Sequence, residues 1–257
     1  MSAQASIKFF DLVSPIGPPL SPNTWLVRYI LNYKKLSYHT EWVPFADVEA
    51  VLVQNGIPPT SETYPRYTVP AIIDSTTSNE SPKIIADSMR IADYLESTYP
   101  AYPIYPGGSR ELQVKLIEVF NTHVRPPMVP MGYAMLPAIF EGRDKDAFVA
   151  SRINMFVRLT GGLHPADLYP EEKRDEMWAA LYAGLDTLAS YIDENGLGKT
   201  EWLFGTDGPA YVDFVLAAWF FWFKLVGPEG CWDRIKGRNG GRWERLHEAC
   251  QKYTEVL

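Results

Sequence analysis

Apolar residues follow two different patterns along the chain, and the first pattern mixes strands with helices. Residues 7–13 are rich in strand-forming residues and precede a loop with three prolines. Ser21-Pro22 then predicts a helix start, because Ser is a preferred N-cap residue and Pro suits the first helical position. Aromatic residues recur behind it at four-residue spacing: Trp25, Tyr29 and Tyr33. With a second strand at 37–43, this order predicts a right-handed strand–helix–strand unit.

A hairpin and a second helix are expected next. Residues 44–68 contain Pro58, Pro59 and Pro65, and we expect an irregular connection there. Two short apolar segments, 69–73 and 83–86, enclose a polar turn at 74–82 and predict a β-hairpin. A helix then begins at Asp87 or Ser88 and ends before Tyr99-Pro100.

The second pattern begins after residues 99–109, where prolines and glycines favour an extended linker. Beyond it only helical periodicity is found, in the segments 110–125, 144–160, 171–194, 210–225 and 241–255. Pro126, Pro127 and Pro130 are expected to kink or break the first of these helices. The chain therefore predicts an α/β domain at 1–98, a linker at 99–109 and an all-helical domain at 110–257.

Charge and cysteine content exclude several kinds of partner. The 257 residues include 24 Lys and Arg against 31 Asp and Glu, a formal charge of −7, and no basic run, so we expect no nucleic-acid partner. Cys231 and Cys250 lack any Cys/His cluster, so we expect reduced, partly buried thiols and no metal site. No secretory signal is recognised, and the longest apolar run, residues 215–223, is too short to span a bilayer. We expect a soluble, cytoplasmic protein without membrane partners.

Ser21 is the first candidate for chemistry. It lies where a helix N-terminus follows a strand, a place that offers free N–H groups and partial positive charge to an anion. Its hydroxyl could stabilise a bound thiolate by donating a hydrogen bond. The alternative is that Ser21 only caps the helix. Asn23 and Thr24 are polar groups of the same first turn, and Thr24 could simply satisfy the helix locally.

Two further pairs of residues could bind a peptide-like ligand. Val69-Pro70 begins a strand, and a cis bond there would turn backbone groups of Val69 towards a ligand; a plain trans Pro at a strand edge is the alternative. Asp87-Ser88 offers a carboxylate for an ammonium group, and a hydroxyl with helix N–H groups for a carboxylate. The alternative is an ordinary capping pair.

The order and spacing of Ser21-Pro22, Val69-Pro70 and Asp87-Ser88 resemble the cytosolic glutathione transferase family over nearly the whole chain. The resemblance implies a thioredoxin-like N-terminal domain, a helical-bundle C-terminal domain and glutathione as co-substrate. In that family a Ser, Cys or Tyr acts on the thiol, a cis Val-Pro holds the cysteinyl backbone, and an acid–Ser pair holds the γ-glutamyl group. Ser21 is thereby the implied catalytic residue. The implied glutathione-binding residues are Asn23, Arg66, Thr68, Val69, Pro70, Asp87 and Ser88.

The segments Leu20-Ser-Pro-Asn-Thr-Trp25, Tyr38-His-Thr-Glu-Trp-Val-Pro44 and Tyr67-Thr-Val-Pro-Ala71 most resemble the fungal A-type class related to bacterial β-etherases, which uses a Ser. This resemblance implies conjugation of aromatic electrophiles, peroxide reduction or a β-etherase-like reaction, with a role in detoxification. It also implies ligandin-like binding of aromatic and polyphenolic compounds, and a homodimer. A ligand carrier without catalysis on the same fold is the alternative function.

Other parts of the chain depart from the family pattern or leave choices open. Many relatives hold the glycyl carboxylate with a Lys, but residues 41–68 contain no Lys, which leaves Arg66, Lys34, Lys35 and His39 as candidates. In the segment leading into the core helix, Ala210 replaces the usual Ser or Thr cap, while Asp213 is retained. The hydrophobic substrate is expected between the domains. Candidate wall residues are Ile16, Met128, Met131, Tyr133 and Trp222, with packing in the core as the alternative.

Overall fold

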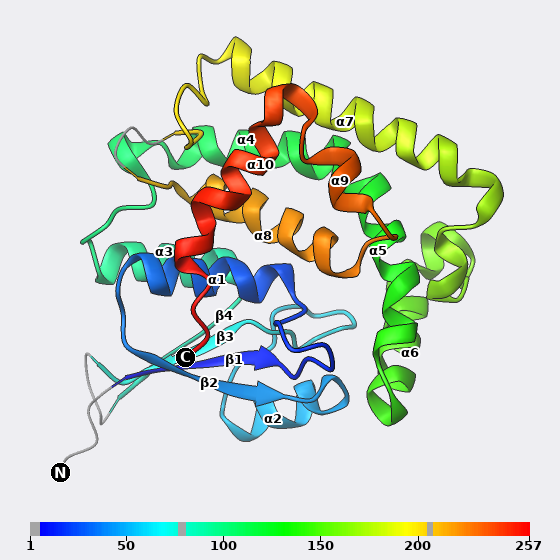
Figure 1. The fold of residues 1–257 in the computed structure, drawn as a ribbon. Helices are drawn as coiled ribbons and strands as arrows, with labels where there is room; N and C mark the ends of the chain where they lie inside the picture. Colours follow the sequence, from blue (N-terminus) through cyan, green and yellow to red (C-terminus); the bar gives the residue numbers. More distant parts are fainter. Residues whose placement is uncertain (1–5, 77–80, 205–207) are drawn as a thin grey trace.

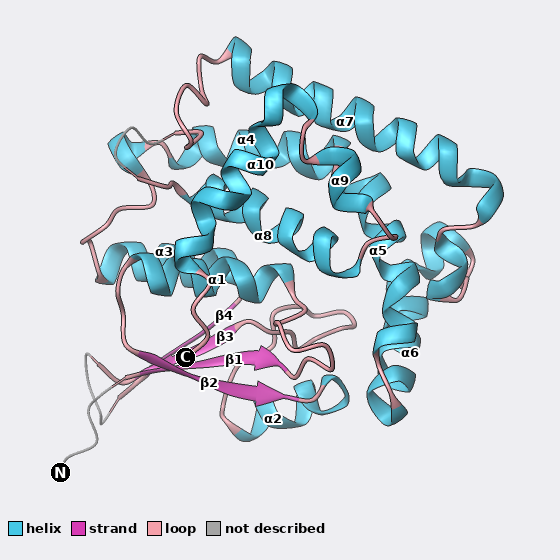
Figure 2. Cartoon of the chain, in the orientation of Figure 1, coloured by secondary structure: helices cyan, strands magenta, loops and turns pink. Residues whose placement is uncertain are grey.

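The computed structural model describes residues 6–76, 81–204 and 208–257, apart from the side chains of Phe156 and residues 158–160. Figure 1 shows a four-stranded sheet below a set of helices, with α1 lying between the sheet and α8. Figure 2 separates the strand-containing part from the purely helical part. The end of the chain returns to the sheet, where the N–H of Thr40 donates to the carbonyl of Leu257 at 3.1 Å.

The N-terminal part has the thioredoxin-like order that the sequence predicts. Its elements are β1 (Ile7–Leu12), α1 (Pro22–Tyr33), β2 (Tyr38–Val43), the 3₁₀ turn η1 (Phe45–Asp47), α2 (Val48–Gln54), β3 (Ala71–Asp74), β4 (Lys83–Ala86) and α3 (Ser88–Thr98). The strand order is β2-β1-β3-β4, with β1 and β2 parallel and the other neighbours antiparallel. The parallel unit and the hairpin are thus confirmed; residues 77–80 of the predicted turn lie outside the described residues.

The second part is helical, as predicted. It comprises the turn η2 (Pro106–Gly108), α4 (Arg110–His123), α5 (Arg125–Ile139), α6 (Gly142–Thr160), the turns η3 (Pro165–Leu168) and η4 (Glu171–Lys173), α7 (Arg174–Glu194), α8 (Tyr211–Val226), α9 (Cys231–Ile235), α10 (Arg238–Cys250) and η5 (Gln251–Tyr253). Each predicted helical segment overlaps one of these helices. Residues 99–109 stay our proposed linker.

One expectation about regular structure is wrong, and another is confirmed only in part. The connection at 44–68 is not wholly irregular, because Val48–Gln54 forms α2, a helix too short for a clear apolar repeat. The prolines after residue 125 break the chain between α4 and α5 but do not stop the second helix. Pro126 and Pro127 occupy its first turn, where an N–H has no partner within the helix, whereas Pro130 and Pro137 lie inside it.

The sheet separates two apolar cores. The larger core runs from the α1 face of β1 through α1 and α8 into the helical domain, so one continuous core joins the two parts. The smaller core lies on the opposite face of the sheet, beneath α2, and includes Phe10, Val43 and Leu52. An ion pair of fully buried groups crosses from α1 to β1, where Arg28 donates to Asp11 at 2.8 Å. These contacts fix α1 firmly against the sheet.

Both cysteines are fully buried rather than partly buried, and neither forms a disulfide. The Cys231 thiol donates to the carbonyl of Phe223 at 3.0 Å, and burial raises its pKa to about 11.

Within the described ranges, no helix has the length and apolar character that crossing a membrane requires.

Candidate active site

Strand register brings the three predicted ligand-binding segments to one edge of the sheet. Phe10 near the end of β1 pairs with Ala71 at the start of β3, and Ala71 pairs with Ala86 at the end of β4. The loop after β1, which leads to Ser21, therefore meets Val69-Pro70 and Asp87-Ser88 at the same edge. A cleft of about 460 Å³ opens there between the two parts of the chain. It is lined by Ser21, Asn23, Arg66, Thr68 and Val69, among others.

Ser21 is both the N-cap of α1 and a wall of the cleft. Its Oγ accepts the N–H of Thr24 at 3.4 Å, so the capping interpretation is confirmed. A hydroxyl that accepts still has one O–H to donate, and capping therefore does not exclude a hydrogen bond to a ligand. Pro22 has no N–H, which leaves the N–H of Asn23 as the first-turn donor without an intrahelical partner. The loop before Ser21 is held by Trp25, whose indole N–H donates to Pro19 at 2.7 Å.

The Val69-Pro70 peptide bond is cis, as the family resemblance implied, and a second cis bond precedes Pro65. Thr68 lies in the same wall, and its hydroxyl is 3.0 Å from that of Thr60. The N–H of Thr60 also donates to the carbonyl of Arg66 at 2.8 Å. These bonds fold the segment 60–68 on itself and hold the backbone that enters β3.

Asp87 caps α3, and both of its capping bonds use the same oxygen. Oδ1 accepts the N–H groups of Met89 and Arg90 at 3.0 and 3.1 Å. Its backbone has φ 83°, a left-handed value that costs a non-glycine residue on the order of 1–3 kcal/mol. Asp87, Ser88 and Pro70 do not belong to the lining of the cleft itself and lie beyond its margin at the same sheet edge.

Among the cations left open as glycyl-carboxylate partners, Arg66 lines the cleft and the others do not. Lys34 is buried and forms an ion pair with Glu96 at 2.7 Å. Lys35 lines a different cleft, and His39 is exposed on β2. Arg66 is therefore the candidate whose position agrees with binding in this cleft.

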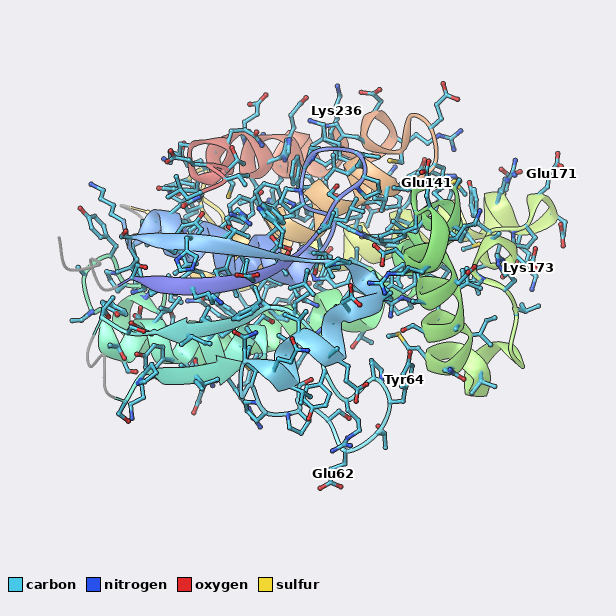
Figure 3. The ribbon with its side chains drawn as sticks, turned by 90° about the horizontal axis from the view of Figure 1, so that it is seen from below. Glu62, Tyr64, Glu141, Glu171, Lys173 and Lys236 are labelled. Carbon is cyan, nitrogen blue, oxygen red and sulfur yellow. The ribbon has the colours of Figure 1, made fainter. Side chains whose placement is uncertain are left out.

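The helical domain supplies an aromatic outer wall. Tyr133 of α5 and Trp222 of α8 line the cleft, as expected, with ring centroids 5.7 Å apart. Phe148 of α6 packs edge-on against Tyr133 at 6.0 Å. The loop of residues 55–68 closes the outer end, where Tyr64 and Met155 of α6 both line the cleft; Figure 3 shows the loop carrying Tyr64 beside α6.

Three predicted wall residues are in other places. Met128 and Met131 are 0% exposed and belong to the large apolar core, because α5 is covered by neighbouring helices on that face. Ile16 is 41% exposed in the loop after β1 and does not line the cleft. The core interpretation was therefore right for both methionines.

Several lining residues were not foreseen from the sequence. They include Phe45 and Phe140, which pack at 5.7 Å between ring centroids, and two arginines, Arg125 and Arg152. The arginines had a detectable signal: Arg125 opens an otherwise apolar helix, and Arg152 follows Phe148 by one helical turn. Glu49 of α2 is the one carboxylate among the described lining residues.

Asp213 organises the entry to α8 without the usual cap. One carboxylate oxygen accepts the N–H of Ala210 and the other accepts that of Leu203, both at 2.8 Å. Ala210 has no side-chain acceptor, so only the Asp half of the motif is present. Burial raises the pKa of Asp213 to about 7 despite these two bonds.

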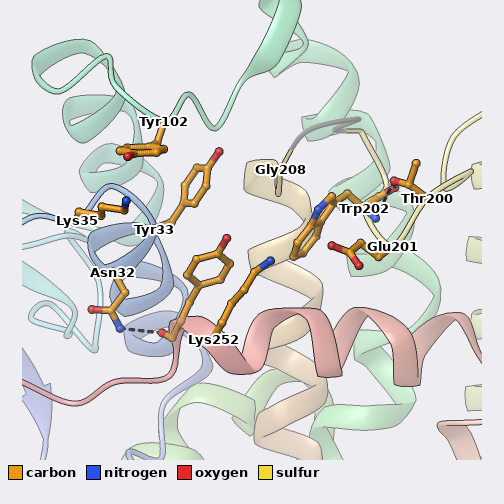
Figure 4. A pocket seen from close by; sticks show the side chains of 10 residues that line it. Asn32, Tyr33, Lys35, Tyr102, Thr200, Glu201, Trp202, Gly208 and Lys252 are labelled. Atoms are coloured by element: carbon orange, nitrogen blue, oxygen red, sulfur yellow. Dashed lines mark hydrogen bonds between the residues drawn. The ribbon is translucent and has the colours of Figure 1, made fainter.

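A second cleft of about 630 Å³ lies at the opposite end of α1 (Figure 4). Tyrosine rings line one side, with Tyr33 at 5.7 Å from Tyr102 and 5.5 Å from Tyr253. Lys252 extends towards Trp202, and its ammonium is 5.0 Å from the indole centre. Within the described ranges, neither cleft contains a His, Cys, Asp or Glu cluster that could hold a metal ion.

A thioredoxin-like domain joined to an all-helical domain, with a cleft between them at the N-terminus of the first helix, defines a class of thiol-handling proteins. The chain belongs to the glutathione S-transferase family: the N-terminal domain of that family matches residues 16–103, and its C-terminal domain matches residues 112–253.

Fungal proteins are among the similar ones. Glutathione transferase GSTFuA3 from Phanerochaete chrysosporium is 32% identical, with a TM-score of 0.84 and 99% of each chain covered. CsGST63524 from Ceriporiopsis subvermispora, solved in complex with glutathione, is 30% identical, with a TM-score of 0.86 and coverage of 98% of this chain and 99% of the other. The glutathione S-transferase-like protein ustS from Aspergillus flavus is 26% identical over 98% of this chain and 92% of its own length.

Proposed function

We propose that this protein binds glutathione in the cleft at Ser21 and transfers its sulfur to an aromatic electrophile. The observation that carries the proposal is the position of Ser21, with a hydroxyl donor and a helix N-terminus at a cleft whose outer wall is aromatic. Glutathione complexes among the similar fungal structures support the choice of co-substrate. The proposed glutathione contacts are those implied by the family: Asn23, Arg66, Thr68, Val69, Pro70, Asp87 and Ser88.

In this proposal each contact binds a different group of glutathione. Asp87 Oδ2, which is not used in capping, meets the ammonium of the γ-glutamyl group, and Ser88 donates to its carboxylate. Val69 pairs with the cysteinyl backbone in the manner of an added strand. Arg66 binds the glycyl carboxylate. Ser21 Oγ–H and the N–H of Asn23 then hold the sulfur as a thiolate, assisted by the dipole of α1.

The transfer step follows from the thiolate. The sulfur lone pair forms a bond to an electrophilic carbon, the bond to the leaving group breaks, and that group departs with its electron pair. With a peroxide, the thiolate attacks the terminal oxygen, the O–O bond breaks, and the departing alkoxide takes a proton from solvent, which gives an alcohol and a sulfenic acid. A second glutathione then attacks the sulfenic sulfur and gives the disulfide and water. We propose both reactions for the same site.

Retention on immobilised glutathione, followed by turnover of a generic chlorodinitrobenzene, tests this function. We expect elution by free glutathione and turnover that is saturable in both substrates. Retention without turnover would favour a ligand carrier over an enzyme. If the protein is not retained and calorimetry detects no binding of glutathione, the proposed function is contradicted.

We also propose ligandin-like binding of aromatic compounds, which the second cleft favours through Tyr33, Tyr102, Tyr253 and Trp202. Calorimetric titration with a polyphenol should give unchanged binding when the first cleft is filled with a stable glutathione conjugate. Tyr102→Ala should weaken that binding, since Tyr102 is exposed at the cleft. Loss of all binding on filling the first cleft would contradict a separate carrier site.

As the resemblance implies, we further propose a cytoplasmic homodimer, testable by sedimentation of the purified protein.

A further inference from the structure

Two arginines of the outer wall lack ionic partners. Arg125 begins α5, Arg152 lies in the middle of α6, and both line the cleft together with Ser21. Neither side chain has a carboxylate within 4 Å in the described part of the chain, although the Nε atom of each is buried without a hydrogen-bond partner. An unpaired guanidinium in a partly buried wall is unusual, because leaving a charge without a partner costs free energy.

Other arginines of this chain show what the ordinary arrangement is. Buried Nε atoms without partners also occur in Arg28, Arg238 and Arg242. Each of those three nevertheless forms an ion pair through its outer nitrogens, with Asp11, Asp186 and Asp193 respectively. Arg125 and Arg152 are thus set apart by the missing carboxylate.

Aromatic rings pack against both guanidinium groups. The Arg125 guanidinium lies 4.3 Å from the Trp219 ring centre, and one of its outer nitrogens donates to Asn121 at 3.0 Å. Arg152 lies 4.9 Å from the centre of Tyr133 and 5.0 Å from that of Phe148. Stacking of this kind occupies the face of a guanidinium and leaves N–H groups at its edge available.

The charges lining the cleft are unbalanced. Three arginines, Arg66, Arg125 and Arg152, face one carboxylate, Glu49. Burial lowers the pKa of Arg125, yet a guanidinium stays charged at any physiological pH. One arginine suffices for the glycyl carboxylate of glutathione, so two positive charges remain beside the aromatic wall.

We propose that the electrophilic substrate is an aromatic compound bearing a carboxylate, and that Arg125 and Arg152 bind this group while the rings of the wall hold its aromatic body. This inference rests on the proposed function and names the substrate class of that site. A guanidinium edge matches the two oxygens of a carboxylate. A neutral aromatic compound of the same shape would leave both charges unpaired.

A matched pair of substrates tests the charge directly. Chlorodinitrobenzoate, with its chlorine opposite the carboxylate, is compared with its methyl ester; in both, the thiolate forms the C–S bond and chloride leaves. We expect kcat/KM for the acid to exceed that for the ester by at least tenfold. Equal values, or preference for the ester beyond its intrinsic reactivity with free glutathione, would overturn the proposal.

Substitution of each arginine tests whether that residue causes the preference for the acid over the ester. Arg125→Gln and Arg152→Gln should each raise KM for the acid by about tenfold, the effect of losing one charge-assisted hydrogen bond. KM for glutathione should stay unchanged, and kcat/KM for the ester should fall much less than kcat/KM for the acid. Arg174→Gln is a matched control, since Arg174 stacks on Tyr169 at 5.2 Å outside the cleft. A rise in KM for glutathione instead would assign these arginines to the glutathione subsite and overturn the proposal.

Binding of the unreactive dinitrobenzoate, measured by calorimetry, separates this inference from the proposed function. Arginine-dependent binding without turnover would contradict the transferase while supporting the anion site. Turnover of the ester, together with an affinity for dinitrobenzoate that neither variant changes, would support the transferase and contradict the anion site. Thermal melting of each variant confirms that it is folded.

Discussion

Ser21 and Thr24 are joined by two hydrogen bonds that close the first turn of α1. The N–H of Thr24 donates to Ser21 Oγ at 3.4 Å, and the hydroxyl of Thr24 donates to the Ser21 carbonyl at 3.0 Å. The pair fixes the side chain of Ser21 at the wall of the cleft while leaving its own O–H free to donate. Capping is therefore compatible with the catalytic role that we propose for the same side chain.

Substitutions at Ser21 can separate these tasks. Ser21→Ala removes the cap and the donor, so we expect a loss of about 1 kcal/mol in stability and a drop in turnover of about a hundredfold or more. Ser21→Gly lacks the hydroxyl but caps helices almost as well, and should lose turnover with only a few tenths of a kcal/mol in stability. Denaturant unfolding and steady-state kinetics measure the two effects. Turnover at the wild-type level in the Gly variant would remove Ser21 from the mechanism.

The buried pair of Asp11 and Arg28 predicts a strongly non-additive result. Asp11→Leu leaves the Arg28 charge buried without an ionic partner, although Tyr38 and Thr40 still accept its N–H groups. Breaking a buried ion pair in this way typically costs 3–5 kcal/mol, so we expect a loss of about that size. The double variant Asp11→Leu/Arg28→Met removes both charges and should be clearly more stable than Asp11→Leu alone. Urea unfolding of the four proteins gives the coupling free energy. Additive losses would show that the pair does not act as a unit.

His247 is expected to destabilise the folded protein in mild acid. Burial, and then the charge of Lys224, lower its pKa to about 4. The unfolded chain takes up this proton near pH 6.5 and the folded chain only near pH 4, so the contribution of His247 to stability falls as the pH drops through that window, by up to about 3 kcal/mol. The raised pKa of Asp213 acts in the opposite direction, with stability falling as the pH rises towards 7.

Comparison of variants isolates the histidine. His247→Gln keeps a neutral polar group beside Lys224 and removes the histidine contribution, so its unfolding free energy should rise relative to that of the wild type as the pH falls from 6.5 to 4. His39→Gln is the control, because His39 is exposed. If both variants follow the wild-type curve, His247 does not contribute the acid sensitivity.

Gly184 permits the close crossing of α4 and α7. A Cβ at this position would meet the carbonyl of His123 and lie 3.3 Å from the Cα of Val124, and both are backbone atoms that cannot turn aside. We expect Gly184→Ala to lose on the order of 1–3 kcal/mol in spite of the better helix propensity of Ala. Gly237→Ala serves as the control, since nothing lies within 4 Å of its Cβ position. Equal melting temperatures for the two variants would refute this account of the crossing.

Elements with strong local signals could be predicted from the sequence. The Ser-Pro start of α1 and the Asp cap of α3 are set by neighbouring residues, and the structure has both helices at the expected positions. Helix α2 was missed because its seven residues give too few turns to establish a period. The continuation of α5 past Pro130 depends on packing against other helices, which no local rule describes.

Site residues were predictable only where a local motif existed. Ser21 and Val69-Pro70 belong to such motifs, and the strand register then brings them together. Met128 and Met131 show the limit of periodicity, since it identifies an apolar face but not whether a core or a cleft covers it. Arg152 was missed for the converse reason: an arginine on a helix is usually solvated, and its one-turn spacing from Phe148 does not show that the two residues line a cleft.

The ionisation of bound glutathione tests the central claim most directly. Ultraviolet thiolate absorption is titrated against pH for glutathione bound to the wild type, to Ser21→Ala and to Ser21→Thr. We predict a thiol pKa well below that of free glutathione in the wild type and in Ser21→Thr, and a value at least one unit higher in Ser21→Ala, since one unit is about 1.4 kcal/mol. An unshifted thiol pKa in the wild type, or the same lowered value in Ser21→Ala, would contradict the assignment of Ser21 as the residue that stabilises the thiolate.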